Sequence, residues 1–239
     1  MKVSFITLTN NGYKNLTKNC LLSLKKLGIN YIKVFCIDQE SYDFLSKDFN
    51  NIYKLDLDEN EIESNLINFR TKNWSKIVYK KFNLIYKELQ NYDYVLFTDG
   101  DIVFEKKGFL EYCLHNIGTN DIIIQDDRVN DKSIIVDGKQ LNVNYIQLCT
   151  GFMLIKNNEK MKYLFNPKNI PEDLDIKCDQ AYVNKYINNF KYKLLPMELF
   201  PNGSYFRLNK TPNKFMVHFN WIIGSRKIEK MKKYNYWLL

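Results

Sequence analysis

The hydrophobic residues of the chain alternate between short apolar runs and helically spaced stripes. The run at residues 3–8 (VSFITL) is apolar and rich in β-branched residues, and turn-prone residues follow it, which predicts a buried first strand. A helical stripe then covers residues 16–27 and ends at Gly28, and residues 31–37 form a second strand. A strand, a helix and a strand in this order predict a parallel pair.

The same alternation continues to residue 104. We predict a short helix near 42–45, a strand near 52–55 and a long helix over 73–91, with a core stripe of Val78, Phe82, Ile85 and Leu89. A strand from residue 92 then runs directly into Asp99-Gly100-Asp101. This order predicts an α/β fold with a mostly parallel sheet, in which ligands bind beyond the carboxyl ends of the strands.

The second half of the chain has a more mixed pattern. Its predicted strands are 121–125, 146–149, 152–155 and 215–218, with Thr150-Gly151 between the second and third, an irregular stretch at 194–200, and helices at 180–187 and 224–234. No internal repeat or linker interrupts the 239 residues, so we predict a single domain.

Composition and charge narrow the class of protein. With 45% hydrophobic residues the chain can bury a large core, and it has neither an apolar run of the roughly 18 residues that span a membrane nor a secretory leader. Its five cysteines are widely spaced, which fits a reducing cytoplasm. A net charge of +8 suits nucleic acid, an anionic membrane or an anionic small substrate.

Asp99 and Asp101 are the strongest chemical signal. In an extended segment their carboxylates point the same way, and their repulsion is relieved by a divalent cation such as Mn²⁺ or Mg²⁺. An ordinary acidic turn is the alternative. His218, at the end of a predicted strand, is either a third ligand or a buried structural histidine.

Several other residues have both a functional and a structural interpretation. Gly224 and Lys227 open a helix that could hold a diphosphate, or one that lies on an anionic surface. Lys81 either reaches a phosphate or extends from an amphipathic helix to solvent. Asp179 and Gln180 either bind sugar hydroxyls or begin a helix. Thr7 and Asn10, near the end of the first strand, are placed for a nucleotide base or ribose, and Asp126 and Asp127 fit a polar loop better than a ligand site.

Taken in order, several segments resemble one family over nearly the whole chain. These segments are LTNNGY, VLFTDGDIVF, CTGFMLI, CDQAYVN, LFPNGSYF and HFNWIIGSRKIEKMKK. They are similar to the nucleotide-diphospho-sugar transferases among the GT-A glycosyltransferases, which include plant cell-wall xylosyl- and galactosyltransferases. One departure concerns the five residues between His218 and Gly224, because the related pattern is tighter.

The resemblance implies a GT-A fold and Mn²⁺-dependent, retaining transfer of a sugar from a nucleotide diphosphate, with UDP favoured. Residues 1–104 would form the nucleotide-binding half and 105–239 the acceptor and sugar half. By position, the metal ligands would be Asp99, Asp101 and His218; the donor would contact Thr7, Asn10, Lys81, Asp99, Gly151, Gly224 and Lys227; and Asp179 and Gln180 would act at the anomeric carbon.

The expected partners follow from the same resemblance. The acceptor would be a hydroxyl of a glycan, glycolipid or glycoprotein, the basic C-terminal helix could touch a membrane surface, and no nucleic acid is expected. Composition rich in Lys, Asn and Ile, with Ala181 as the single alanine, favours a cytoplasmic bacterial or viral enzyme. The competing hypotheses are a non-catalytic basic binding protein and, with less support, a sugar-phosphate nucleotidyltransferase.

Overall fold

The computed structural model describes residues 1–55, 72–128, 135–136, 139–140, 147–170, 179–222, 224 and 226–239, with the backbone alone for 72–78, 135–136 and 139–140. Its elements are β1 (Val3–Thr9), α1 (Lys14–Lys26), β2 (Lys33–Cys36), α2 (Gln39–Leu45), β3 (Ile52–Lys54), α3 (Lys72–Leu89), β4 (Tyr94–Thr98), β5 (Ile102–Phe104), α4 (Phe109–Ile117), β6 (Ile122–Asp126), β7 (Ile135–Val136), β8 (Lys139–Gln140), β9 (Leu148–Lys156), α5 (Glu159–Phe165), η2 (Pro167–Asn169), α6 (Asp179–Lys185), η3 (Ile187–Asn189), β10 (Tyr192–Leu195), α7 (Gly203–Leu208), β11 (Met216–His218) and α8 (Arg226–Lys233).

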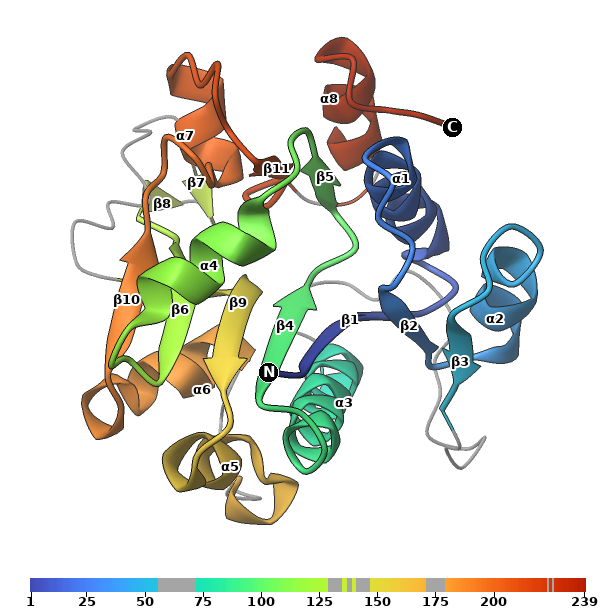
Figure 1. The fold of residues 1–239 in the computed structure, drawn as a ribbon. Coiled ribbons are helices and arrows are strands. Elements are labelled where there is room, and N and C mark those ends of the chain that lie inside the picture. The colour runs from blue at the N-terminus through green and yellow to red at the C-terminus, as the bar shows by residue number, and fades with distance from the viewer. Residues whose placement is uncertain are drawn as a thin grey trace.

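One seven-stranded sheet organises the molecule, in the order β10-β6-β9-β4-β1-β2-β3 (Figure 1). β1 pairs in parallel with β2 and β4, β2 pairs in parallel with β3, and β10 with β6. β9 alone runs antiparallel to its neighbours in this sheet, β4 and β6. The predicted mostly parallel α/β sheet is therefore confirmed. The sheet contains strands from both halves of the chain, before and after residue 104. The assignment of nucleotide binding to residues 1–104 and of sugar and acceptor binding to 105–239 stays a prediction.

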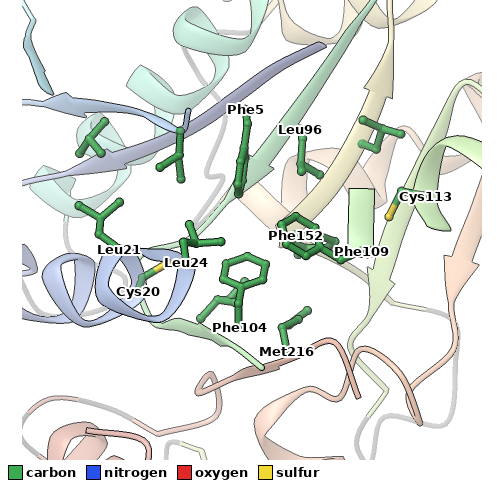
Figure 2. Packing of buried hydrophobic residues seen from close by; sticks show 14 of the residues in the cluster. Phe5, Cys20, Leu21, Leu24, Leu96, Phe104, Phe109, Cys113, Phe152 and Met216 are labelled. Carbon is green, nitrogen blue, oxygen red and sulfur yellow. The ribbon is translucent and has the colours of Figure 1, made fainter. Parts of the chain in front are cut away.

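Adjacent residues of the central strands face opposite sides of the sheet. Phe5 and Leu96 pack with side chains of α1 and α4, and Figure 2 shows Phe104, Phe109 and Phe152 in the same cluster. On the other face, β1 and β4 pack against α3, α5 and α6, and the predicted stripe residues of α3 belong to this second cluster: Phe82, Ile85 and Leu89. Burial of each large apolar side chain stabilises the fold by roughly 1.5–3 kcal/mol.

A third, smaller cluster joins the C-terminal part of the chain to the sheet. β11 pairs antiparallel with β5, and their inner residues Val103 and Val217 contact Leu16 of α1 and Met231 of α8. This pairing brings residues near 218 beside those near 102, although more than a hundred residues separate them. Among the described residues, no helix combines the length and apolar character that crossing a bilayer requires.

Several boundaries differ from the sequence predictions. Residues 148–156 form one strand, β9, instead of two, and its register with β6 shifts across a bulge: Ile124 lies opposite Met153, and Gln125 lies opposite Cys149. Gly151 stays extended there because its carbonyl accepts a hydrogen bond from the N–H of Asp99. Leu194 lies in β10 and not in an irregular segment, because the strand ends just before Pro196. The last helix begins at Arg226, two residues later than predicted.

The short helices α5 and α7 escaped prediction. Seven and six residues are too few for a helical stripe to stand out, yet each has an asparagine N-cap, Asn158 and Asn202 respectively. Two parts of the predictions, the side chain of Val78 and residue 146 at the start of a predicted strand, lie outside the described residues.

Candidate functional site

Two acidic residues and one histidine converge beyond the end of β4. His218 pairs in register with Ile102, so its ring lies beside the acidic turn that precedes β5. Its Nε2 atom is 3.2 Å from Asp101 Oδ1 and 3.9 Å from Asp99 Oδ2. One ligand atom from each of the three residues lies within 4.8 Å of the others. Two carboxylate oxygens and one imidazole nitrogen form a donor set that fits Mn²⁺, and the carboxylates also suit Mg²⁺.

The two acids converge through a turn and not, as predicted, along an extended segment. Asp99 and Asp101 lie between β4 and β5, outside either strand. Gly100 permits this turn because a β-carbon there would lie 2.3 Å from Thr17 Oγ1 of α1. Glycine at position 100 therefore lets α1 approach the acidic turn closely.

A glutamine fixes the orientation of the histidine. The Gln125 amide donates from Nε2 to the carbonyl of Phe200, which leaves Oε1 to face His218 Nδ1 at 2.7 Å. His218 therefore donates from Nδ1 and presents Nε2 to the two carboxylates. A protein partner on the second nitrogen is the usual arrangement of a metal-binding histidine.

Two buried lysines compensate the acidic charges. Lys227 donates to Asp101 Oδ2, and Lys81 Nζ lies 3.0 Å from Asp99 Oδ1 and 2.6 Å from Asp179 Oδ2. Burial opposes ionisation of Asp101, but Lys227 and His218 outweigh it and hold the pKa of Asp101 well below its usual range. Burial disfavours the ammonium of Lys81, yet Asp179 and Asp99 raise its pKa above the ordinary value. Both groups of the Lys227–Asp101 pair are thus charged.

The structure decides against one interpretation of Lys81. The side chain does not extend to solvent from an amphipathic helix, since only 6% of the residue is exposed and its ammonium lies over the ring of Phe97. Its neighbours are carboxylates and the carbonyl of Thr150. Contact with a donor phosphate stays a prediction.

Asp179 and Gln180 begin α6 and face the same site. Asp179 is buried and accepts hydrogen bonds from Lys81 and from Thr150 Oγ1, at 2.7 Å. Gln180 Nε2 donates to Asp127 Oδ2 at 2.8 Å. The start of the helix at Asp179 matches the structural interpretation, while the buried hydrogen bonds bring both side chains to the acidic cluster.

The sequence favoured a polar loop for Asp126 and Asp127. The structure contradicts this, because neither residue lies in a solvated loop. Both are buried, and Asp126 pairs with Arg128. Asp127 accepts from Gln180, from Asn220 Nδ2 at 2.7 Å and from Trp221 Nε1 at 2.9 Å. Burial raises the pKa of Asp127 to about 6, although these donors and His218 act in the opposite direction.

Gly151 lies directly against His218 and Asp99. A β-carbon at this position would be 2.3 Å from His218 Cε1 and 2.8 Å from Asp99 Oδ2. Glycine therefore keeps the space between these two side chains open. The predicted contact of Gly151 with a donor sugar stays a prediction.

The remaining predicted residues lie at the margins of the cluster. Gly224 is exposed, has a φ of 63°, and accepts a hydrogen bond from the N–H of Lys227. Asn10 caps the turn after β1 by accepting from the N–H of Tyr13 at 3.1 Å. Thr7 is buried within β1, and its hydroxyl has no hydrogen-bond partner among the residues that the structure describes.

Sequence reasoning missed three residues that support the site. Gln125 orients His218, while Asn220 and Trp221 hold Asp127. Trp221 adopts a left-handed φ of 58°, which is rare for a bulky residue and costs on the order of 1–3 kcal/mol. A signal was present, because Asn220 and Trp221 lie two and three residues after the candidate ligand His218, and Gln125 follows the apolar run Ile122–Ile124.

Comparison with known proteins identifies the family of this chain. A model of the nucleotide-diphospho-sugar transferase family matches residues 28–233. A UDP-galactose:fucoside alpha-3-galactosyltransferase of Dictyostelium discoideum is 26% identical, and the match covers 98% of this chain but 43% of that protein. The chain thus spans less than half the length of this relative.

Two solved structures show how widely the fold is shared. The galactosyltransferase LgtC, solved with donor and acceptor sugar analogs, matches with a TM-score of 0.53 and 14% identity, over 90% of this chain and 86% of that chain. A 4-diphosphocytidyl-2C-methyl-D-erythritol synthase of Anaerococcus prevotii matches with a TM-score of 0.54 and 12% identity, over 98% of both chains. The fold alone therefore does not choose between such activities, and the family match does.

The family model covers most of the chain, and the mostly parallel sheet is consistent with it. This chain belongs to the nucleotide-diphospho-sugar transferase family and has a GT-A fold.

Proposed function

We propose that the protein is a divalent-cation-dependent glycosyltransferase that moves a sugar from a nucleotide diphosphate to an acceptor hydroxyl with retention of configuration. The observation that carries this proposal is the convergence of Asp99, Asp101 and His218, from two distant segments, at the carboxyl end of a parallel strand. Asp99, Asp101 and His218 would hold Mn²⁺ or Mg²⁺, which neutralises the negative charge that develops on a leaving diphosphate.

Lys227 supports the diphosphate end of the donor. Its ammonium is buried beside a metal-ligand carboxylate, where a second positive charge can meet phosphate oxygens next to the cation. Gly224 precedes it without a side chain, and a β-carbon there would meet no atom within 4 Å. We assign both residues to the diphosphate. Thr7 and Asn10, from β1 and the turn after it, are assigned to the nucleoside.

The sugar would lie between Gly151 and the start of α6. Asp179, held by Lys81 and Thr150, would orient sugar hydroxyls, and Gln180, the next residue of α6, would assist at the anomeric carbon. In the step we propose, the bond from the anomeric carbon to the diphosphate oxygen breaks and the acceptor oxygen bonds to that carbon on the same face. The acceptor proton passes to the departing diphosphate oxygen, so no protein base is needed.

UDP is the nucleotide that we favour, and a glycan, glycolipid or glycoprotein hydroxyl is the acceptor. The relative from Dictyostelium discoideum is named for UDP-galactose and a fucoside, which supports a UDP-sugar donor for this chain. Peripheral membrane contact is a further prediction: one side of α8 is buried at Lys227 and Met231, while Arg226, Lys232 and Lys233 are exposed.

Calorimetry with UDP, GDP and CMP, each with and without Mn²⁺, tests the proposal. We expect UDP to bind only with the cation, and Asp101→Ala to abolish that binding while Asp48→Ala, which removes a surface carboxylate, does not. If no nucleotide binds the unaltered protein with or without Mn²⁺, the enzyme proposal fails and a basic binding protein becomes the better account. NMR of the transferred sugar's anomeric proton then tests retention.

A further inference from the structure

The last six residues turn back from α8 and lie along α1. Asn235 takes a left-handed φ of 62°, and the N–H of Tyr236 donates to the carbonyl of Met231 at 2.7 Å. This hydrogen bond closes the end of α8 and reverses the chain, as in the common left-handed helix ending. We call residues 234–239 the C-terminal tail.

A buried asparagine in the first helix binds this tail. Asn19 has no exposed surface, and its Nδ2 donates to the carbonyl of Tyr236 at 2.9 Å while its Oδ1 accepts from the N–H of Leu238 at 2.6 Å. A carboxamide buried in a helix is costly unless both of its ends are hydrogen-bonded. The tail supplies a partner to each end, so Asn19 and the tail depend on each other.

Two further contacts hold the tail in place. The hydroxyl of Tyr236 is hydrogen-bonded to Glu105, which also pairs with Lys214 at 2.9 Å. The ring of Tyr236 packs edge-on against Phe206 and Phe219, with centroids 5.5 and 5.4 Å away. The polar and aromatic contacts together join the tail to α1, α7 and the end of β5.

The tail matters to the site because α8 is short. Eight residues do not form a stable helix by themselves, so packing must hold α8 in place. Its buried side chains are Lys227, at the acidic turn, and Met231, whose carbonyl receives the tail and whose sulfur lies 4.0 Å from Asn19 Nδ2. The position of Lys227 is therefore linked to Asn19 through one turn of helix.

We propose that Asn19 is a positioning residue for Lys227: by fastening the C-terminal tail to α1, it holds the ammonium of Lys227 where a donor diphosphate binds. This inference rests on the proposed function, since it assumes that Lys227 binds the diphosphate of the donor. Asn19 itself touches neither the acidic residues nor the donor.

Titration of Asn19→Ala with UDP and with UMP, both in the presence of Mn²⁺, tests the inference. UDP and UMP share the base, ribose and first phosphate, so a displaced Lys227 should weaken UDP selectively. We expect the dissociation constant for UDP to rise roughly tenfold or more, as for loss of a charge-assisted hydrogen bond, with that for UMP nearly unchanged. Equal weakening of both ligands would overturn the inference.

The decisive measurement combines two substitutions. If Asn19 acts through Lys227, Asn19→Ala should add nothing to the loss of UDP affinity in a Lys227→Met background, whereas additive losses contradict the inference. Asn157→Ala is the matched control, because the Asn157 side chain also makes two hydrogen bonds to the backbone, in its case to the carbonyls of Leu89 and Tyr92, away from the site. It should destabilise the protein without changing the ratio of UDP to UMP affinity.

A shortened chain provides a second test in case Asn19→Ala does not fold. Ending the chain at Lys233 removes the tail and leaves Asn19 in place, and it should reproduce the selective loss of UDP affinity. If this variant folds and binds UDP normally, the inference is wrong. Failure of the unaltered protein to bind UDP would instead refute the proposed function, so the two failures are distinguishable.

Discussion

The two buried lysines of the site are held in contrasting ways. Lys81 lies on the 18-residue helix α3, against the sheet, with Asp99, Asp179 and the Thr150 carbonyl as acceptors and the ring of Phe97 below it, 4.5 Å from its ammonium. Lys227 lies on an eight-residue helix outside the sheet and pairs with Asp101. The first is part of the core, whereas the second depends on the C-terminal segment.

This difference suggests that the two lysines serve different parts of the site. Groups fixed by the sheet suit a part of the site that must keep one geometry, such as the sugar subsite that we propose around Asp179. A lysine on a peripheral helix keeps its position only while the C-terminal tail holds that helix, so its loss should cost the core little. Stability and ligand affinity should therefore respond differently to loss of each lysine, and three measurements can sharpen or break the comparison.

The largest effect should come from removing Lys81. Lys81→Met leaves two carboxylates without their cation, and breaking such a buried pair costs about 3–5 kcal/mol in the free energy of unfolding. Lys227→Met should cost less, about 1–3 kcal/mol, because it leaves one carboxylate, that of Asp101, without its lysine instead of two. Urea denaturation of both variants measures the difference.

An exposed ion pair provides the control for this comparison. Lys18 and Asp48 pair at 2.6 Å with side chains that are 21% and 45% exposed, so Lys18→Met should change stability by less than about 1 kcal/mol. If Lys227→Met destabilises the protein as much as Lys81→Met, the contrast between the two regions is wrong. The substitution Asp179→Asn should partly rescue Lys81→Met by removing one uncompensated charge.

The sequence predicted the sheet side of the site better than the helix side. An apolar run followed by Asp99-Gly100-Asp101 identifies a strand end, and strand ends of a parallel sheet gather at one edge, so the acidic pair was placed correctly. His218 was found because a polar residue ends the apolar run before it. Local patterns suffice where a strand itself carries the residue to the site.

Contacts between distant segments were not predictable in this way. The ion pair of Lys81 with Asp179, the support of His218 by Gln125 and the binding of the tail by Asn19 join residues 98, 93 and 217 or more positions apart. Asn19 lies on the buried side of the amphipathic helix α1, where in the sequence it looks like a polar residue that interrupts the apolar stripe. Only the packing of α8 and the tail against α1 gives it partners.

A substitution at Gly151 should have an intermediate effect, on cation affinity. The β-carbon of Gly151→Ala would clash with the ring of His218, so either the ring or β9 must move. We expect Mn²⁺ to bind roughly ten- to hundredfold more weakly, as when the support of a metal ligand is lost. Gly118→Ala is the control: Gly118, unlike Gly151, has a positive φ, which strains any β-carbon, but a β-carbon there meets no atom within 4 Å. It should lower stability and leave the Mn²⁺ affinity unchanged, and equal affinities for the two variants would contradict the close packing at Gly151.

The smallest effect concerns Asp127, which joins α6 on the sheet side of the site to the segment after β11 on the C-terminal side. It accepts from Gln180 on α6 and from Asn220 and Trp221 after β11. Its pKa of about 6 in the folded protein lies above the unfolded value near 4, so its contribution to stability is full below pH 4 and is lost as the pH rises through 6. Asp127→Asn removes this dependence, and the amide of Gln180 can turn to accept from the new side chain.

The free energy of unfolding of Asp127→Asn, compared with that of the unaltered protein, should therefore rise by about 1.4 kcal/mol between pH 5 and pH 8, equivalent to about one pKa unit. Urea titrations at both pH values measure this difference, in which the opposite contribution of Asp101 cancels because both proteins retain it. A difference that stays constant with pH would show that Asp127 has an ordinary pKa. Burial between α6 and the segment after β11 would then not restrict its ionisation, and the two regions would be less closely packed at Asp127 than its three hydrogen bonds indicate.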